Sequence, residues 1–186
     1  MSAAWDFSTC RAGSCYGLES ELHTQEGRSA VGALQGFAPG AVACLQDGGG
    51  LVNNLRVWEN LILPAWYHES AAMADLELRV AAALDAVAVP EGERLSLMAA
   101  LPASLSRSQC RVLALVRALV QAPAWLVVEV EWLAWLQGAA NIHCKEAFGV
   151  LTQSRPLLLL GVGAMLHAEP LPIIAETKES DAVAER

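Results

Sequence analysis

Residues 101–130, LPASLSRSQCRVLALVRALVQAPAWLVVEV, carry the clearest structural signal in the chain. Ser106 and Gln109 form an S-x-x-Q capping box, in which each side chain satisfies a free backbone donor at the start of a helix. Apolar residues then recur at helical spacing until Pro123, which ends the helix. Residues 125–130 follow as a short, valine-rich run, typical of a strand covered on both faces. We therefore predict a helix that begins after residue 106 and leads into a buried strand.

Apolar patterns elsewhere predict further elements around this pair. Two brief apolar runs, Ala30–Leu34 and Ala41–Leu45, predict two short strands, because glycines and a proline between them indicate a turn. The other predicted elements are an amphipathic helix over 75–89, a helix over 139–153 and a buried strand over 157–162. Residues 1–30 have weak periodicity and carry no prediction. Helices that alternate with apolar strands predict an α/β domain with a mainly parallel sheet.

Length and charge limit the classes of protein to which the chain can belong. The 186 residues predict a single domain over 1–186, with a core of ordinary size and a charged, flexible tail over 178–186. A formal net charge of -8 argues against a nucleic-acid partner, because phosphate binding needs clustered Lys and Arg. The hydrophobic content of 54% is high for a free-standing domain, so part of the apolar surface is expected at an interface.

Membrane, disulfide and metal signals are weak. The longest apolar run, Pro156–Leu166, is shorter than the roughly 20 residues of a membrane helix, and the N-terminus lacks the basic-then-apolar pattern of a signal peptide. We expect a cytoplasmic protein, held at a membrane by its partners. The five cysteines and four histidines show neither C-x-x-C nor H-x-x-x-H spacing, so neither a disulfide framework nor a metal site is predicted.

Three stretches, in this order and spacing, carry a family resemblance: LSRSQ at 105–109, LALVRAL at 113–119 and APAWLVVEVE at 122–131. Together they resemble the nucleotide-binding subunits of ABC transporters, in which an LSGGQ signature opens a helix and a Walker B strand follows. Upstream, ACLQDGGGLVNNLRVWENLILP at 43–64 resembles the Q-loop segment, with Gln46 in place of its glutamine. The sequence of this segment is most similar to those of the ATPase subunits of MCE-type phospholipid transporters.

The resemblance covers residues 41–165 and implies a fold. That fold is an incomplete ABC-ATPase-like (RecA-like) α/β core with a mainly parallel sheet, plus a small helical subdomain over 53–104. Residues 1–40 are then a divergent N-terminal part that lacks a phosphate loop, since no G-x-x-x-x-G-K-[ST] occurs in the chain. GALQG at 32–36 lies roughly where that loop is expected, and the helix that should follow it is missing from the predicted elements.

The catalytic positions of the family also differ here. Carried across by the resemblance, the magnesium aspartate falls on Glu129, the catalytic glutamate on Val130 and the following proline on Glu131. The switch histidine falls on Val162, and WLAWLQG at 132–138 lacks the D-loop aspartate. The resemblance therefore implies an ATPase-like pseudoenzyme with no catalytic residue, no metal and no cofactor of its own.

A subunit without a phosphate loop can still present its signature to ATP bound by a partner. The start of a helix offers free N–H groups, so Ser106, Arg107, Ser108 and Gln109 are the candidates for such a contact in trans. Arg107 and Ser108 replace the two signature glycines, where side chains obstruct close approach, although an arginine adds a cation near phosphate. The alternative is that Ser106 and Gln109 only cap their helix.

The VWEN segment at 57–60 suggests a second contact with a partner protein. In the family it lies near the permease, so Trp58, Glu59 and Asn60 are the predicted permease contacts, with packing inside the domain as the alternative. The resulting expectation is a non-catalytic subunit at the cytoplasmic face of a bacterial inner membrane. It pairs with an active ABC ATPase subunit, an MCE-type permease or both, for lipid transport. The alternatives are a soluble regulatory or scaffold protein that reuses the fold, and a gene product without a stable role.

Overall fold

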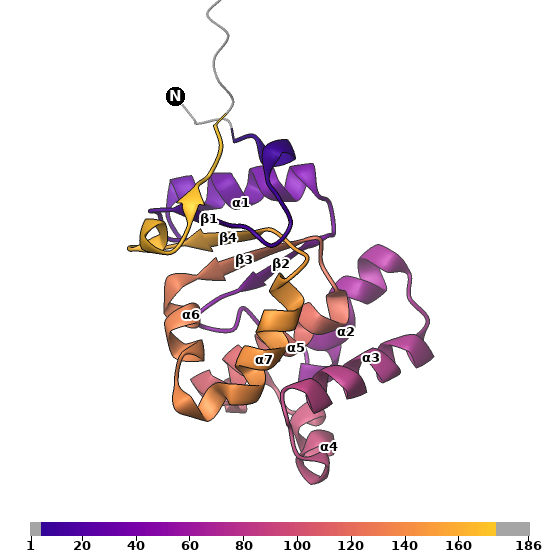
Figure 1. The fold of residues 1–186 in the computed structure, drawn as a ribbon. Coiled ribbons are helices and arrows are strands. Elements are labelled where there is room, and N and C mark those ends of the chain that lie inside the picture. The colour runs from indigo at the N-terminus through magenta and orange to yellow at the C-terminus, as the bar shows by residue number, and fades with distance from the viewer. Residues whose placement is uncertain (1–4, 174–186) are drawn as a thin grey trace, which may run out of the picture.

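A five-stranded sheet lies between two helical layers in the computed structural model, which describes residues 5–173 (Figure 1). The strand order is β2-β3-β4-β1-β5, and every neighbouring pair is parallel. The strands are β1 (Cys15–Leu18), β2 (Val42–Leu45), β3 (Trp125–Glu129), β4 (Leu157–Leu160) and β5 (Glu169–Pro170). The predicted α/β fold with a mainly parallel sheet is confirmed.

The helices are divided unequally between the two faces of the sheet. Helix α1 (Gln25–Phe37) covers one face, and the remaining helices lie on the other side (Figure 1). These are α2 (Val57–Glu69), α3 (Met73–Ala86), α4 (Glu91–Ala99), α5 (Arg107–Gln121), α6 (Val130–Leu136) and α7 (Ile142–Thr152). Short 3-10 helices occur at Phe7–Thr9, Pro102–Ser104, Ala139–Asn141 and Ala164–Leu166.

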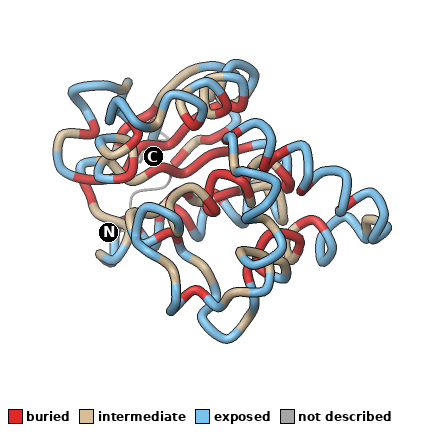
Figure 2. The backbone as a smooth tube through the Cα atoms, turned by 90° about the horizontal axis from the view of Figure 1, so that it is seen from below, coloured by how far each residue is buried: buried red, intermediate tan, exposed pale blue. Residues whose placement is uncertain are grey.

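Two hydrophobic clusters hold these layers together. Successive side chains of a strand point to opposite faces, so Trp125 and Val127 of β3 pack on the α1 side while Leu126 and Val128 pack on the α5 side. The residues of β4 alternate in the same way. Figure 2 shows the buried residues concentrated along the strands and the inner sides of the helices. The buried strands predicted within 125–130 and 157–162 are therefore present as β3 and β4, although β4 ends at Leu160 and Val162 beyond it is exposed.

The capped helix and the strand after it lie where the sequence places them. Ser106 is the N-cap of α5, and the reciprocal bonds of the capping box with Gln109 are both present. The helix ends at Gln121, with Ala122 in the left-handed region at φ 47° before Pro123. Strand β3 is one residue shorter than predicted, because Val130 already belongs to α6.

The predicted strand over Ala30–Leu34 is wrong, because these residues lie within α1. Thr24 caps this helix, and Ala30, Val31 and Leu34 form its buried face. The apolar window was too short to reveal helical periodicity, which becomes visible once the polar residues 25–29 are included. The helix expected to be missing is thus present, and GALQG at 32–36 lies inside it rather than in a loop.

The other predicted elements agree with the structure. The strand over 41–45 is β2, and the helices over 75–89 and 139–153 are α3 and α7 with ends shifted by a few residues. The regular elements between 53 and 104 are all helical, although the proposed limits of that subdomain stay predictions. The tail over 178–186 lies outside the described residues. None of the helices within 5–173 has both the length and the hydropathy needed to cross a bilayer.

Candidate functional site

The ends of the parallel strands meet at a small cavity of 170 Å³. Ligands of open parallel sheets bind at this edge, outside the carboxyl ends of the strands. The lining residues come from the segments that follow β1 and β2, from the end of β3 and the start of α6, and from the end of β4. Four of the six are acidic: Glu21, His23, Asp47, Glu129, Glu131 and Leu160. The site is therefore dominated by carboxylates.

The segment between β1 and α1 folds back onto the start of α1. The hydroxyl of Thr24 accepts the N–H of Gly27 at 3.0 Å and donates to the carbonyl of Glu21 at 2.8 Å, while Ser20 Oγ lies 2.7 Å from Thr24 Oγ1. A Cβ on Gly27 would overlap the Glu21 carbonyl, so only glycine allows this close approach. The chain itself therefore closes the N-terminus of α1.

Acidic side chains add to this closure. A helix N-terminus attracts phosphate through free N–H groups and a positive dipole end, but Glu26 lies in the first turn of α1 and Glu21 lines the cavity beside it. Sequence reasoning missed this loop and helix start, although Thr24 followed by Gln25 and Glu26 is an N-terminal signal.

Glu129, the last residue of β3, is a partly buried member of this acidic group. Its Oε2 accepts the backbone N–H of Asp47 at 2.7 Å, which ties the end of β3 to the loop after β2. Burial raises the pKa of Glu129 above its ordinary value, the charges of Glu131 and Glu21 raise it further, and His23 opposes this. Within residues 5–173, no group of three or more His, Cys, Asp or Glu side chains is arranged to hold a metal ion.

Asp47 fastens the loop after β2 to the start of α5. Its two carboxylate oxygens form ion pairs with Arg107 and Arg111, and Arg111 Nε also donates to the Asp47 carbonyl at 3.0 Å. The Arg107 side chain is 67% exposed, whereas Arg111 and Asp47 are 15% and 16% exposed. We refer to Asp47, Arg107 and Arg111 as the Asp47 clamp.

The glycines after the clamp lie against the same helix. At Gly49, with φ +81°, a Cβ would lie 2.6 Å from the carbonyl oxygen of Cys110. Arg117 Nη1 donates to the Gly50 carbonyl at 2.7 Å. The side-chain oxygen of Gln46, the Q-loop-like glutamine, lies close to Gly50, and Gln46 does not line the acidic cavity. The loop is thus laid along α5 from its first turn to its last third.

The residues matched to the Walker B motif stand at the end of β3. Glu129 lines the cavity, while Val130 begins α6 and packs against Gly161, where an added Cβ would lie 3.3 Å from the valine Cβ. Val162 is 74% exposed and is not among the lining residues. Residues 132–138 belong mainly to α6, and the indole N–H of Trp132 donates to the Arg111 carbonyl at 3.3 Å.

The four signature residues are exposed at the start of α5. Ser106 Oγ accepts the backbone N–H of Gln109 at 3.2 Å, and Gln109 Oε1 accepts the Ser106 N–H at 2.9 Å. Arg107 is engaged by Asp47 of its own chain. The capping role of Ser106 and Gln109 is therefore present, whereas their contact with a partner's ATP stays a prediction.

The three residues predicted to face a permease occupy different environments. Asn60 is 1% exposed and bonds to the backbone of Val52, Leu55 and Arg56, so it supports the turn before α2 from the inside. Glu59 is exposed and accepts the Arg56 N–H at 2.6 Å, and Trp58 is half-buried against the main core. Direct contact with a partner is open to Glu59 and to part of Trp58 but not to the buried amide of Asn60.

The sequence matches no protein-family model and no curated protein. Solved structures share its fold: the ATP-binding subunit of an ABC transporter aligns with a TM-score of 0.59 and 13% identity, over 88% of this chain and 79% of that chain. The chain has the fold of an ABC transporter ATPase subunit. A dimeric ATP-binding cassette in a post-hydrolysis state, bound to ADP and Pi, aligns with a TM-score of 0.52 and 16% identity.

That second alignment covers 68% of this chain and 54% of the other, so the chain spans about half the length of the dimeric cassette. The coverage agrees with the expected incomplete ABC-ATPase-like core. At these identities the likeness shows the fold alone.

Proposed function

We propose that the chain is a non-catalytic ABC-ATPase-like subunit of a bacterial membrane transport complex. In this proposal it pairs with an active ABC ATPase subunit, a permease or both, and reaches the cytoplasmic face of the inner membrane through them. The ABC-type fold supports membership of such a complex. The lipid cargo and the MCE-type permease rest on the resemblance of residues 43–64 to the ATPase subunits of those transporters.

The acidic cavity is the observation that carries the non-catalytic part of the proposal. Phosphoryl transfer depends on neutralising the charge of the phosphates. At the edge of the sheet where a ligand is expected, this chain places Glu21, Asp47, Glu129 and Glu131. Glu129 is partly buried beside Glu131 and Glu21, so a triphosphate there meets repulsion rather than neutralisation.

The end of β3 supports the same conclusion. Val130 stands where the resemblance places the catalytic glutamate, and its aliphatic side chain can neither orient water nor accept a proton. The start of α1 is already capped by Thr24, so its N–H groups are not all free for an anion. The loss of a single charged group lowers catalysis by on the order of 10³-fold, and these losses combine.

Partner contact is the role that remains in this proposal. The exposed start of α5, with Ser106 and Ser108, is the surface available to a nucleotide held by a second subunit. In and just before the VWEN segment, Asn53, Asn54 and Glu59 are exposed and Trp58 is half-buried, so these residues are the ones open to a permease. The buried Asn60 then holds the shape of this surface.

Measurements of ATP turnover and ATP binding test whether the chain is non-catalytic. We expect the purified chain with ATP and Mg²⁺ to show no turnover above that of a mock preparation and no dissociation constant in the micromolar range by calorimetry. Glu129→Gln combined with Glu131→Gln should strengthen any residual millimolar binding, because it removes two negative charges from the cavity. Micromolar ATP affinity or genuine turnover in the unmodified chain would refute this part.

Isolation from native membranes tests the transport role. The tagged chain should bring down a permease or a competent ABC ATPase, and Trp58→Ala together with Glu59→Ala should lower that recovery. Gln25→Ala, at an exposed position of α1 on the opposite face of the sheet from α2, serves as a control away from this surface. Recovery of neither partner from the membrane fraction would count against the transport role, and a permease of a different transporter class would refute the MCE-type assignment.

A soluble regulatory or scaffold role is the second candidate, and one observation favours it. Three of the four signature residues are already engaged within the chain, Ser106 and Gln109 by each other and Arg107 by Asp47, which leaves Ser108 as the one without such a bond among the described residues. If the chain pairs with an active ATPase, Ser106→Ala should lower the turnover of that complex. Unchanged turnover in an intact complex would favour the scaffold role.

A further inference from the structure

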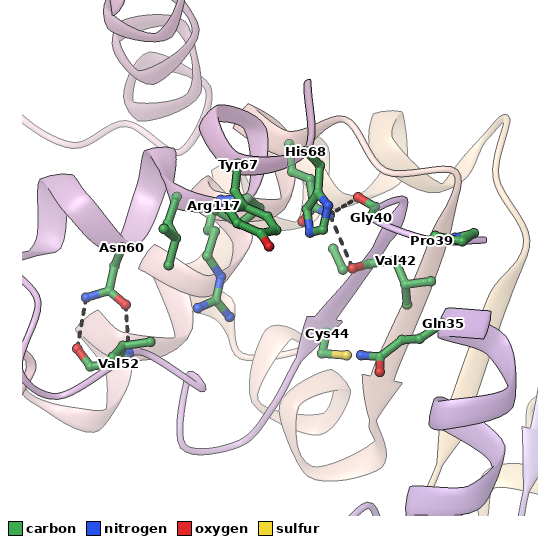
Figure 3. Close-up of a pocket in the computed structure, with 14 residues that line it drawn as sticks. Gln35, Pro39, Gly40, Val42, Cys44, Val52, Asn60, Tyr67, His68 and Arg117 are labelled. Carbon is green, nitrogen blue, oxygen red and sulfur yellow. Dashed lines mark hydrogen bonds between the residues drawn. The ribbon is translucent and has the colours of Figure 1, made fainter. Parts of the chain in front are cut away.

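A larger cavity, of 760 Å³, opens at the free edge of β2 (Figure 3). Its walls are the end of α1, the connection from α1 to β2, the outer edge of β2, Val52 of the loop after β2, one side of α2 and two residues of α5. The volume lies within the range of about 300–1,000 Å³ found for small-molecule sites. Its lining differs completely from that of the acidic cavity.

The charge of this cavity is opposite to that of the chain. None of its lining residues is Asp or Glu, although the chain carries 20 acidic residues and a net charge of -8. Arg117 lines the cavity, and its guanidinium lies below Tyr67 in the view of Figure 3. Among residues 5–173, no ion pair includes Arg117.

The Arg117 guanidinium is only partly satisfied by the protein. It donates to the Gly50 carbonyl at 2.7 Å and to the Gly49 carbonyl at 3.4 Å, which leaves other N–H groups of its fork without a protein acceptor among the described residues. Burial lowers the pKa of Arg117 from its ordinary value, which reflects the loss of water around the charge. A partly desolvated cation without a carboxylate partner gains most from an anionic ligand.

The rest of the lining is mostly apolar. Val42, Leu63 and Pro64 face the space, and Val52 stands at its rim with 44% exposure. Gln121 also lines the cavity, but its amide already donates to the carbonyls of Gly40 and Val42 at 3.0 and 3.2 Å, so it closes part of the strand edge. The cavity thus combines the Arg117 guanidinium with an apolar wall and a few polar side chains, among them Gln35, Tyr67 and His68.

We propose that this cavity binds a small single-chain amphiphile, with an anionic head group paired to Arg117 and an apolar chain along Val42, Leu63 and Pro64. A carboxylate or phosphate head suits the planar fork of the guanidinium, which can form two parallel hydrogen bonds with it. The apolar chain of such a ligand covers the apolar wall of the cavity, which an inorganic anion would leave in contact with water. The site does not depend on the transport role, because it uses neither the signature nor the acidic cavity.

Calorimetry on the full chain with octanoate tests the site, with octanol, acetate and inorganic phosphate as matched probes. Octanoate should bind at least about tenfold more tightly than octanol, which lacks the charge, and than acetate or phosphate, which lack the chain. Arg117→Gln should weaken octanoate about tenfold or more and leave octanol within about twofold. Arg94→Gln is the matched control, because Arg94 pairs with Asp85 and does not line the cavity.

A second variant guards against misfolding, since Arg117 also holds the loop at Gly50. Val52→Trp fills the exposed rim without removing any hydrogen bond of Arg117 and should weaken octanoate and octanol together. The proposal is overturned if octanoate does not saturate at millimolar concentration, if octanol, acetate or phosphate binds equally well, or if Val52→Trp leaves octanoate affinity unchanged. An equal loss in Arg94→Gln and Arg117→Gln would also overturn it, because that indicates a general charge effect.

Discussion

Replacing Asp47 with asparagine tests whether the loop after β2 is held on α5 by the Asp47 clamp. The substitution preserves the size of the side chain and removes the charge that pairs with Arg107 and Arg111. The bond between the backbone N–H of residue 47 and Glu129 does not involve this side chain, so the substitution leaves it in place. The change in stability therefore reports mainly on the two ion pairs.

The exposures of the three side chains determine how much stability each ion pair contributes. The pair with Arg107 joins a guanidinium that is 67% exposed, so it should contribute below about 1 kcal/mol. The pair with Arg111 joins side chains that are 15% and 16% exposed, and a charge-assisted hydrogen bond in that setting contributes about 1.5–3 kcal/mol. We expect Asp47→Asn to lower the free energy of unfolding by about 2–3 kcal/mol, and Arg107→Gln by less than about 1 kcal/mol.

Urea unfolding, followed by circular dichroism, measures these differences. With a denaturant slope of about 2 kcal/mol/M, Asp47→Asn should lower the urea midpoint by about 1–1.5 M. Double-mutant cycles should give a coupling of at least about 1 kcal/mol between Asp47→Asn and Arg111→Gln, and a smaller one with Arg107→Gln. At about 1 M NaCl the Arg107 coupling should disappear, because it is exposed to salt, while the Arg111 coupling largely persists.

Three results would refute the clamp as described. The first is a loss below about 0.5 kcal/mol for Asp47→Asn, which is the size expected of an ordinary surface change. The second is equal coupling of Asp47 to both arginines, which contradicts their different exposure. The third is unchanged amide hydrogen exchange across residues 46–50 in Asp47→Asn, because a loop released from α5 should exchange faster.

Three further substitutions test other parts of the site by thermal or urea unfolding. Gly27→Ala should destabilise the protein by about 1–3 kcal/mol, because the added Cβ overlaps a backbone carbonyl. Gly32→Ala in the same helix has open space around it and should stabilise by about 0.5–1 kcal/mol. Equal effects of the two substitutions would contradict the close packing of the β1–α1 segment on the start of α1. Asn60→Ala should lower the free energy of unfolding by about 3 kcal/mol, because it leaves buried backbone groups without a partner. Asn53→Ala, at an exposed position, should lower it by less than about 0.5 kcal/mol. Similar losses in the two variants would refute the internal role of Asn60. The pKa of Glu129 is raised in the folded state above its ordinary value of 4.5. Its contribution to stability is therefore fully present below pH 4.5 and is lost as the pH rises through the folded pKa, because the ionised carboxylate is disfavoured in the folded protein. Glu129→Gln should therefore raise Tm at pH 7, by no more than about 2 °C, and this gain should disappear below pH 4.5. A lower Tm at pH 7 would contradict the burial of Glu129 among acidic side chains.

The elements that could be predicted from the sequence are those whose signals are local. The cap at Ser106, the stop at Pro123 and the apolar runs of β3 and β4 each lie within a few consecutive residues, and the structure contains all of them. Helix α1 was missed because its buried face, at Ala30, Val31 and Leu34, fits a short apolar strand as well as one side of a helix. The polar turn that starts the helix lies outside that window.

The two cavities could not be predicted in the same way, because each is assembled from residues far apart in the chain. Glu21, Asp47 and Glu129 become neighbours only when three parallel strands end at one edge of the sheet. The same holds for Arg117, which α5 carries to the free edge of β2. Composition gives the net charge of -8 but not its division into an acidic cavity and a cavity without carboxylates.

Local order and long-range assembly therefore account for different properties of this chain. Short-range periodicity, caps and turn residues establish the helix-to-strand unit of α5 and β3 and the α/β class, because these depend on hydrogen bonds and side-chain spacing along consecutive residues. The closed start of α1, the Asp47 clamp and the placing of Arg117 depend on packing between distant segments, which the hydrophobic clusters on the two faces of the sheet bring together.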